Sequence, residues 1–331
     1  MTITYRADAQ AFLNAPGQPL IADAGLKLNL AHVTAAPPIP GTLFDTRKMV
    51  TKSLTEIAQS NLVVATTGKH VTETSHHNGT AIVLGLQNFT ITDSDPKRAM
   101  NSLFNDGIRV FQLWYQDANR FGGGFACPTV GITDECKNIL ENMSELGAIL
   151  DLSHAGITSA RQVLAHVKQR GLPLKVMVSH TGCYNLFPHM RNLPDDILRE
   201  VVGLGGVVGI YTLTFGLDAK DNTTDSFTKH LSHAIKVCGA ENIVVGSDGE
   251  YREAPSIEDM QCQFEKMKGM VDRDGYFNAR CPAQPIKTFS ADKMGVLAHE
   301  MWAALPTSLE GSIPGIAGLN LKRFFETALP N

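Results

Sequence analysis

The sequence predicts an α/β fold in which a single (β/α)8 barrel of the TIM type extends over residues 1–331. Short apolar runs rich in β-branched residues alternate with segments of helical period, as expected for βαβ units. Eight such runs are present, the number of strands that closes this barrel. Most runs are almost continuously apolar, which is typical of parallel strands covered on both faces. An open, doubly wound sheet is the alternative, but no GxGxxG motif follows the first run.

The eight runs are spread along the first three quarters of the chain. They are IADAGLKLNL (21–30), LVVATTG (62–68), TAIVLGLQN (80–88), IRVFQLWY (108–115), AILDLSH (148–154), KVMVSHT (175–181), VVGIYTL (207–213) and IVVGSD (243–248). After the eighth run the pattern changes, and residues 249–290 contain scattered prolines and glycines. We therefore expect a long excursion there, within the same domain.

Capping residues mark the ends of several predicted helices. Thr133 stands where an N-cap is expected, and Gly147 closes the same helical segment. Gly171 ends the next one. Pro194 begins a third, with acidic residues in its first turn, where they interact favourably with the helix dipole. These signals place a helix between consecutive predicted strands.

Composition excludes several classes of partner. The chain is 43% hydrophobic and 19% charged, with a net charge of -4, so it lacks the basic surface that nucleic-acid binding requires. No segment reaches the roughly 20 apolar residues of a membrane helix, and the N-terminus does not resemble a secretory signal. The six cysteines form no close CxxC pair, which favours free thiols over a cysteine zinc site. We expect a cytoplasmic protein.

Polar residues stand at the ends of five predicted strands. They are Gln87, Tyr115, His154, His180 and Asp248. In a (β/α)8 barrel these ends converge on one mouth, where the loops build the active site. A single histidine is more often a hydrogen-bonded structural residue than a ligand. Two histidines with an aspartate favour a metal site or catalysis, because neutral imidazoles and carboxylates are ligands that zinc selects.

Four segments carry a resemblance to a known family. They are ILDLSHAG, VSHTG, RNLPDDILREVVGLGGVVGIY and HLSHAIKVCGAENIVVGSD, in this order. From about residue 80 to 250 the chain resembles the renal or membrane dipeptidase family of zinc peptidases, which belongs to the amidohydrolase-like, metallo-dependent hydrolase barrels. The resemblance implies a (β/α)8 barrel with two zinc ions bridged by a glutamate. It also implies hydrolysis of dipeptides, often with a D-residue at the carboxyl end, and a homodimer.

The resemblance assigns roles to residues of this chain. His154 and His180 match the two histidines of one zinc site, and Asp248 matches the aspartate that transfers protons beside the metal pair. Arg191 matches the arginine that binds the substrate carboxylate, a role suited to the bidentate guanidinium. Tyr115 stands where many members have a histidine that contacts the reacting carbonyl oxygen, and a tyrosine hydroxyl also donates a hydrogen bond.

Two departures from the family pattern concern the metal ligands. Gln87 stands at the position of the bridging glutamate, and a neutral amide cannot compensate the charge of two divalent ions. The His-x-Asp pair of strand one is also missing. Strand one is either DAGLK (23–27), around Asp23, which lacks both ligands, or His32-Val33-Thr34, which keeps only the histidine. The chain therefore resembles a divergent subgroup that lacks both features.

We therefore expect one zinc ion, held by His154 and His180, with Gln87, Asp248 or His32 as candidates for further ligands. The expected function is a metal-dependent hydrolase of a dipeptide or another small carboxylate-bearing amide. Asp248 and Tyr115 are the expected catalytic residues, and Arg191 and Gln87 the expected substrate-binding residues. Two alternatives remain: a non-hydrolytic enzyme of the decarboxylase or tautomerase type on the same scaffold, and an inactive homologue that binds a ligand.

Overall fold

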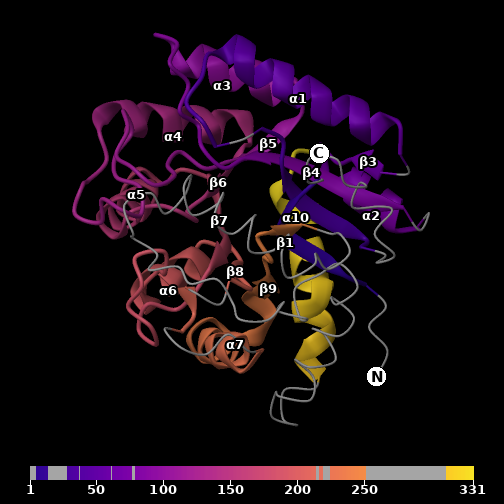
Figure 1. The fold of residues 1–331 in the computed structure, drawn as a ribbon, viewed down its shortest axis with the longest axis vertical. Helices are drawn as coiled ribbons and strands as arrows, with labels where there is room; N and C mark the ends of the chain where they lie inside the picture. The colour runs from indigo at the N-terminus through magenta and orange to yellow at the C-terminus, as the bar shows by residue number, and fades with distance from the viewer. Residues whose placement is uncertain are drawn as a thin grey trace, which may run out of the picture.

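The strands of the computed structural model form one parallel sheet that curls into a near-closed barrel, with helices around its outside (Figure 1). The structure describes residues 5–13, 28–36, 38–60, 62–76, 79–213, 216–218, 224–250 and 311–331. Every pair of neighbouring strands in this sheet is parallel. The (β/α)8 barrel predicted from the alternating pattern is confirmed.

The sheet runs in the order β10-β1-β2-β4-β5-β6-β7-β8-β9, and β3 pairs only with β4. The strands are β1 (Ala7–Phe12), β2 (Leu30–Thr34), β3 (Leu62–Val64), β4 (Thr80–Leu86), β5 (Ile108–Phe111), β6 (Ile149–Asp151), β7 (Lys175–Thr181), β8 (Val208–Ile210), β9 (Ile243–Val245) and β10 (Gly249–Glu250). The short strand β10 continues from β9 and pairs with β1, with Gly249 opposite Ala11. This pairing joins the last strand of the barrel to the first.

Helices follow most of the strands and cover the outside of the barrel (Figure 1). They are α1 (Leu43–Ala58), α2 (Gly68–His76), α3 (Pro96–Asn105), α4 (Asp134–Leu146), α5 (Ile157–Arg170), α6 (Asp195–Gly203), α7 (Thr224–Cys238) and α10 (Asn320–Ala328), with the short turns η2 (Ala240–Asn242) and η5 (Gly315–Leu319). None of these described helices is long and apolar enough to cross a membrane.

The predicted capping residues lie at the beginnings and ends of helices, as expected. The Thr133 side chain accepts a hydrogen bond from the backbone N–H of Cys136 and so caps α4. Gly147 and Gly171 follow α4 and α5 in the left-handed conformation, with φ of 72° and 59°. This conformation is strained for residues with a Cβ, which explains why glycine stands at both positions. Pro194 directly precedes α6.

Two apolar clusters stabilise the barrel. The larger one lies between the strands and the surrounding helices, and it includes Trp114 and Phe121. The smaller one fills the barrel interior with residues from seven of the eight barrel strands, among them Val83 and Met177, and with Val207, which directly precedes β8. The helix α10 contributes Phe325 to this inner cluster. The C-terminal helix therefore packs against the interior side chains of the barrel.

The predicted first strand is wrong. The first barrel strand is β1, whose sequence ADAQAF contains no β-branched residue and therefore gives no strong strand signal. The run 21–30 was expected to be a strand, but β2 begins only at its last residue, Leu30, and Asp23 lies outside the described residues. The run at 62–68 forms β3, which pairs only with β4 and is not part of the barrel wall. The excursion predicted at 249–290 begins with β10, and its remainder lies outside the described residues.

Candidate active site

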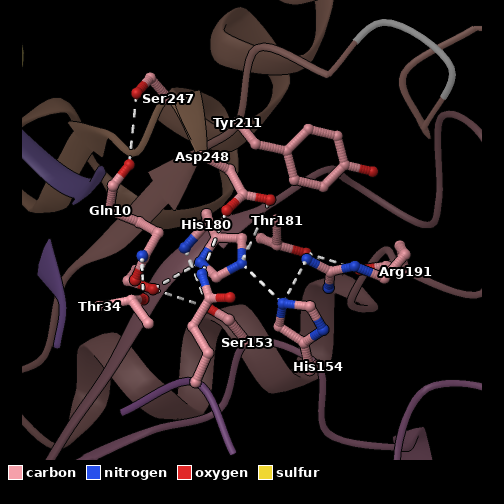
Figure 2. A network of polar contacts seen from close by, with 12 residues as sticks. Gln10, Thr34, Ser153, His154, His180, Thr181, Arg191, Tyr211, Ser247 and Asp248 are labelled. Atoms are coloured by element: carbon pink, nitrogen blue, oxygen red, sulfur yellow. Dashed lines mark hydrogen bonds and ion pairs between the residues drawn. The ribbon is translucent and has the colours of Figure 1, made fainter. Parts of the chain in front are cut away.

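The structure brings together most of the residues expected at the barrel mouth (Figure 2). His154 follows β6, His180 lies within β7, and Asp248 lies between β9 and β10. Gln87 follows β4, and its side-chain amide contacts Asp248. Arg191 lies in the loop between β7 and α6, and its guanidinium points at His154. Residues up to 161 positions apart in the sequence therefore share one site.

Two of these residues have an unusual backbone conformation. His154 has φ of 69° and Asp248 has φ of 52°, and they are the only non-glycine residues with positive φ in the part of the chain that the structure describes. Such a conformation costs of the order of 1–3 kcal/mol for a residue with a side chain. The surrounding structure must therefore fix both residues in this conformation against its energetic cost. Backbone strain of this kind concentrates at functional sites.

The two histidines face each other through their Nε2 atoms. The distance between Nε2 of His154 and Nε2 of His180 is 2.9 Å. Nη2 of Arg191 lies 3.1 Å from the same nitrogen of His154. A guanidinium only donates hydrogen bonds, so Nε2 of His154 accepts and carries a lone pair. The ring of Tyr115 stacks on His154 at 4.2 Å between centroids, which fixes the plane of the imidazole.

Both imidazoles are neutral at physiological pH. Burial lowers the pKa of His154 well below its usual value, and the charge of Arg191 lowers it further. The same two causes, in the same order, lower the pKa of His180. Oδ2 of Asp248 lies 3.8 Å from Nε2 of His180, but with a neutral imidazole this contact is not an ion pair. Neutral imidazoles are the form that binds metal ions.

Asp248 and Gln87 form the opposite side of the site. The amide Nε2 of Gln87 donates to Oδ1 of Asp248 at 3.2 Å. Burial raises the pKa of Asp248, while Arg191 and the hydrogen bond from Gln87 act in the opposite direction. A raised pKa makes the carboxylate a better proton acceptor. The predicted role of Asp248 in proton transfer is compatible with this environment and stays a prediction.

Arg191 is a buried cation with unused hydrogen-bonding capacity. It is 4% exposed, and Nη1 has no hydrogen-bond partner among the described residues. Its guanidinium lies 5.4 Å from the ring centroid of Phe125 and 5.7 Å from that of Tyr211. Aromatic rings stabilise the cation but leave its in-plane donors unsatisfied. A buried donor without a partner is costly, so this guanidinium is suited to binding an anionic group.

Strand one carries neither of the expected ligands. Both placements considered for it are wrong, because β1 is the first strand and holds Gln10 and Phe12 two residues apart. Nε2 of Gln10 donates to Oγ1 of Thr34 at 2.8 Å. His32 lies on β2 and pairs with Val83 of β4. Val83 precedes Gln87 by four residues, so His32 lies deeper in the barrel than Gln87 and away from its mouth. Its Nδ1 donates to the backbone oxygen of Ala9 at 2.7 Å, which holds the side chain within the barrel.

The donor set does not fit a two-metal centre. Gln87 offers no carboxylate to bridge two ions, and the strand-one side chains, Gln10 and Phe12, are a neutral amide and an apolar ring. Two of these three residues supply only an amide oxygen, and the third supplies no ligand atom. Two divalent cations would therefore lack the charge compensation that carboxylates give.

The same donor set is suitable for one cation. His154 and His180 supply two neutral nitrogens that face each other, and Asp248 supplies a carboxylate beside them. Two histidines and one carboxylate form the protein ligands of many catalytic zinc sites. As arranged, no three His, Cys, Asp or Glu side chains within the described ranges form a complete metal site. With Oδ2 of Asp248 at 3.8 Å from Nε2 of His180, the carboxylate stands beside an ion that the two histidines would hold.

Three polar residues beside the histidines were not predicted from the sequence. Asp151, Ser153 and Ser179 are buried and hydrogen bonded to one another. Their signal in the sequence is polar side chains at alternate positions of otherwise apolar strands, as in ILDLSH and VMVSH. Alternation places Asp151 and Ser153 on one face of the strand. Only the closed barrel shows that this face is the interior.

Comparison with known proteins supports the resemblance. The chain is similar to dipeptidase verJ of Clonostachys rogersoniana, with 27% identity over 216 residues that cover 63% of this chain and 53% of that protein. It is similar to dipeptidase 3 of Mus musculus, with 30% identity over 172 residues, 49% of this chain and 34% of that protein. The chain therefore spans about half of the first relative and about a third of the second.

Solved structures share the fold. An amidohydrolase from Pseudomonas aeruginosa superposes with a TM-score of 0.75 at 18% identity, over 98% of this chain and 96% of that one. A metallopeptidase from Rhodobacter sphaeroides, liganded with a phosphinate mimic of the dipeptide L-Ala-D-Ala, superposes with a TM-score of 0.71 at 15% identity, over 98% and 99%. The model of the membrane dipeptidase family matches residues 42–280 of this chain. Since this match covers well over half of its length, the chain belongs to the membrane dipeptidase family, peptidase family M19.

Proposed function

We propose that the protein is a metal-dependent hydrolase that uses one zinc ion to cleave a dipeptide or another small amide with a free carboxylate. The observation that carries this proposal is the 2.9 Å approach of the Nε2 atoms of His154 and His180, with Asp248 beside them. Family membership supports the metal and the reaction class. The loss of the bridging carboxylate at Gln87 supports a single ion.

Arg191 binds the substrate carboxylate in this proposal. Its unpartnered Nη1 and the neighbouring Nη2 offer two parallel donors, the arrangement that a carboxylate accepts best. Nη2 would leave His154 when a metal ion takes the lone pair on Nε2, and the freed guanidinium would then offer both Nη atoms to the carboxylate. Metal and substrate would thus each take one of the two groups that this hydrogen bond now joins.

His154 and His180 would hold the metal ion, which would supply Lewis acidity for the amide carbonyl and lower the pKa of a water molecule. Asp248 accepts the proton of the attacking water and passes it to the amine that leaves as the C–N bond breaks. Tyr115 donates a hydrogen bond to the carbonyl oxygen as negative charge develops there. Burial raises the pKa of Tyr115, so its hydroxyl remains protonated and continues to donate.

The direct test is amine release from a panel of dipeptides by the zinc-supplied protein. The panel includes L-Ala-D-Ala, because the metallopeptidase from R. sphaeroides binds a mimic of it. We expect cleavage of at least one dipeptide, and loss of this activity in Asp248→Asn, where the asparagine tolerates the positive φ. Zinc-bound wild type that releases no amine from any member of the panel contradicts the proposal.

A second function is favoured by one contact. Nη2 of Arg191 occupies a hydrogen-bonding position on Nε2 of His154, one of the two nitrogens that a metal would need. If that contact persists, the site is a metal-free polar pocket that binds a carboxylate through Arg191. It would then catalyse a decarboxylation or tautomerisation with His180 and Asp248, or only bind its ligand. Turnover or binding that survives chelation, without amine release, supports this second function.

A further inference from the structure

The carboxylate of Asp151 receives five hydrogen bonds in the barrel interior. The backbone N–H groups of Ser153 and Ser179 donate to Oδ1 at 3.0 and 2.9 Å, and the Ser153 hydroxyl donates to the same atom at 2.8 Å. Nε2 of Gln112 donates to Oδ2 at 2.7 Å, and the Ser179 hydroxyl donates to it as well. Asp151, Ser153 and Ser179 are at most 1% exposed. Every group around this carboxylate is a donor, so the carboxylate only accepts.

The Ser179 hydroxyl connects this carboxylate to a histidine of the site. Oγ of Ser179 lies 2.7 Å from Nδ1 of His180. A hydroxyl has one hydrogen, and here that hydrogen is directed at Asp151. Oγ must therefore accept from His180, which means that Nδ1 of His180 carries the hydrogen. A neutral imidazole has only one N–H, so Nε2 of His180 carries a lone pair.

We infer that Asp151 and Ser179 are positioning residues that hold His180 in the Nδ1–H tautomer and direct its Nε2 lone pair at His154. Nε2 of His154 also carries a lone pair, because Arg191 donates to it. Two lone pairs then face each other across 2.9 Å. Such a contact is repulsive unless both lone pairs bind one cation. The inference deepens the proposed function, but the tautomer itself rests only on contacts within the protein.

Ser153 offers a matched control. It is buried on the neighbouring strand, and its hydroxyl also donates to Asp151. Its oxygen accepts from the backbone N–H of His180 at 2.9 Å and lies 3.2 Å from Oγ of Ser179, where neither hydroxyl donates to the other because both hydrogens are directed at Asp151. Ser153→Ala therefore removes a comparable number of buried hydrogen bonds beside the same histidine. It leaves the hydrogen bond at Nδ1 of His180 in place.

The experiment is long-range ¹H–¹⁵N NMR of the histidine rings in the metal-free full chain, with the His180 signals assigned by their loss in His180→Ala. We expect the Nδ1–H tautomer of His180 in wild type and in Ser153→Ala. In Ser179→Ala the hydrogen should move to Nε2, where it can donate to His154. The zinc Kd should rise about 10- to 100-fold in this variant, the usual effect of losing a group that orients a ligand. Ser179→Thr restores the hydroxyl and should restore both properties.

A wild-type His180 that carries its hydrogen on Nε2 overturns the inference. So does an unchanged tautomer in Ser179→Ala. These outcomes are independent of metal binding, because the spectra are recorded without metal. If the tautomer shifts as expected but no variant and no wild type binds zinc, the inference stands and the proposed function fails.

Discussion

Arg191 is the residue whose chemistry most clearly indicates a ligand. A buried guanidinium whose Nη1 has no hydrogen-bond partner among the described residues has a desolvation cost that a further acceptor would reduce. Its direct contacts are the imidazole of His154 and two aromatic rings, and although its charge also acts on Asp248, no described residue accepts a hydrogen bond from Nη1. A carboxylate of the substrate is the natural partner for such a group.

For a dipeptide substrate, Arg191→Ala should therefore reduce kcat/KM by at least about 30-fold, which corresponds to about 2 kcal/mol of lost binding to a buried charge. Arg191→Lys should recover only part of the loss, because an ammonium cannot form the bidentate pair. The control is the same dipeptide with an amidated C-terminus, on which wild type and Arg191→Ala should be similarly slow. Equal losses on the free and amidated substrates would contradict carboxylate binding by Arg191.

Among the elements, α10 has a structural role that its position at the end of the chain does not reveal. Phe325 is fully buried in the inner cluster of the barrel, and its ring centroid lies 6.4 Å from that of His32. The helix also contacts α2 and β1, elements from the beginning of the chain. The interior apolar side chains of the barrel therefore depend on a segment more than 300 residues from the first strand.

Phe325→Ala should lower the free energy of unfolding by about 3–5 kcal/mol, because it removes a buried ring and leaves a cavity. Phe44→Ala makes the same chemical change at a side chain that is 77% exposed. Its effect should stay within about 0.5 kcal/mol. Denaturant unfolding of both variants measures the difference. Similar midpoints for the two variants would show that α10 does not stabilise the barrel interior.

The last six strands of the barrel can be predicted from the sequence, and the first strand cannot. The runs that became β4 to β9 are apolar and rich in β-branched residues, because both of their faces are buried. In contrast, β1 alternates alanine with Asp8 and Gln10, and small side chains give neither a strand propensity nor a helical period. The run that became β3 has the right composition, but only pairing in the folded chain excludes it from the barrel wall.

The candidate site likewise has residues that the sequence predicts and contacts that only the folded chain shows. His154, His180 and Asp248 are predictable because polar residues that end apolar strands must meet at the barrel mouth. The contacts of Asp151 with Ser179 require the register of β6 on β7, which the sequence does not contain. That Gln10 and Phe12 stand where the family has metal ligands also cannot be recognised until β1 is identified.

Strand one offers a test of the single-metal proposal. Gln87→Glu alone restores a carboxylate beside Asp248 but no ligand on β1, so we expect the variant still to bind one ion. The triple variant Gln10→His, Phe12→Asp, Gln87→Glu should bind two, because it supplies the missing ligands of the family pattern. Elemental analysis gives the stoichiometry, and circular dichroism verifies the fold. Two ions in wild type, or one in a folded triple variant, would contradict the assignment of β1.

The whole molecule contains several histidines that are buried in the neutral form. Burial is the largest cause of a lowered pKa at His32, His154, His180 and His230. Above pH 6.5 these groups are neutral in both the folded and the unfolded chain. Below it the unfolded chain takes up protons that the folded chain does not. The raised pKa of Asp248 has the opposite effect, because the folded chain binds this proton at a higher pH than the unfolded chain does, but Asp248 is a single group.

Stability should therefore fall as the pH is lowered from 7.5 to 5.5, by up to about 1.4 kcal/mol per pH unit for each of these histidines. The measurement is denaturant unfolding at several pH values in the presence of a chelator, so that metal release does not contribute. A free energy of unfolding that stays constant or increases over this range would show that the histidines are not held neutral.

In the proposed function, His154 and His180 together hold one metal ion at the barrel mouth. The most direct test is elemental analysis of the full chain after equilibration with zinc and removal of the excess. We expect one zinc ion per chain in wild type. We expect none in His180→Ala or in His154→Asn, in which asparagine tolerates the positive φ of position 154. Wild type that remains free of zinc, or either variant that retains a full equivalent, would contradict it.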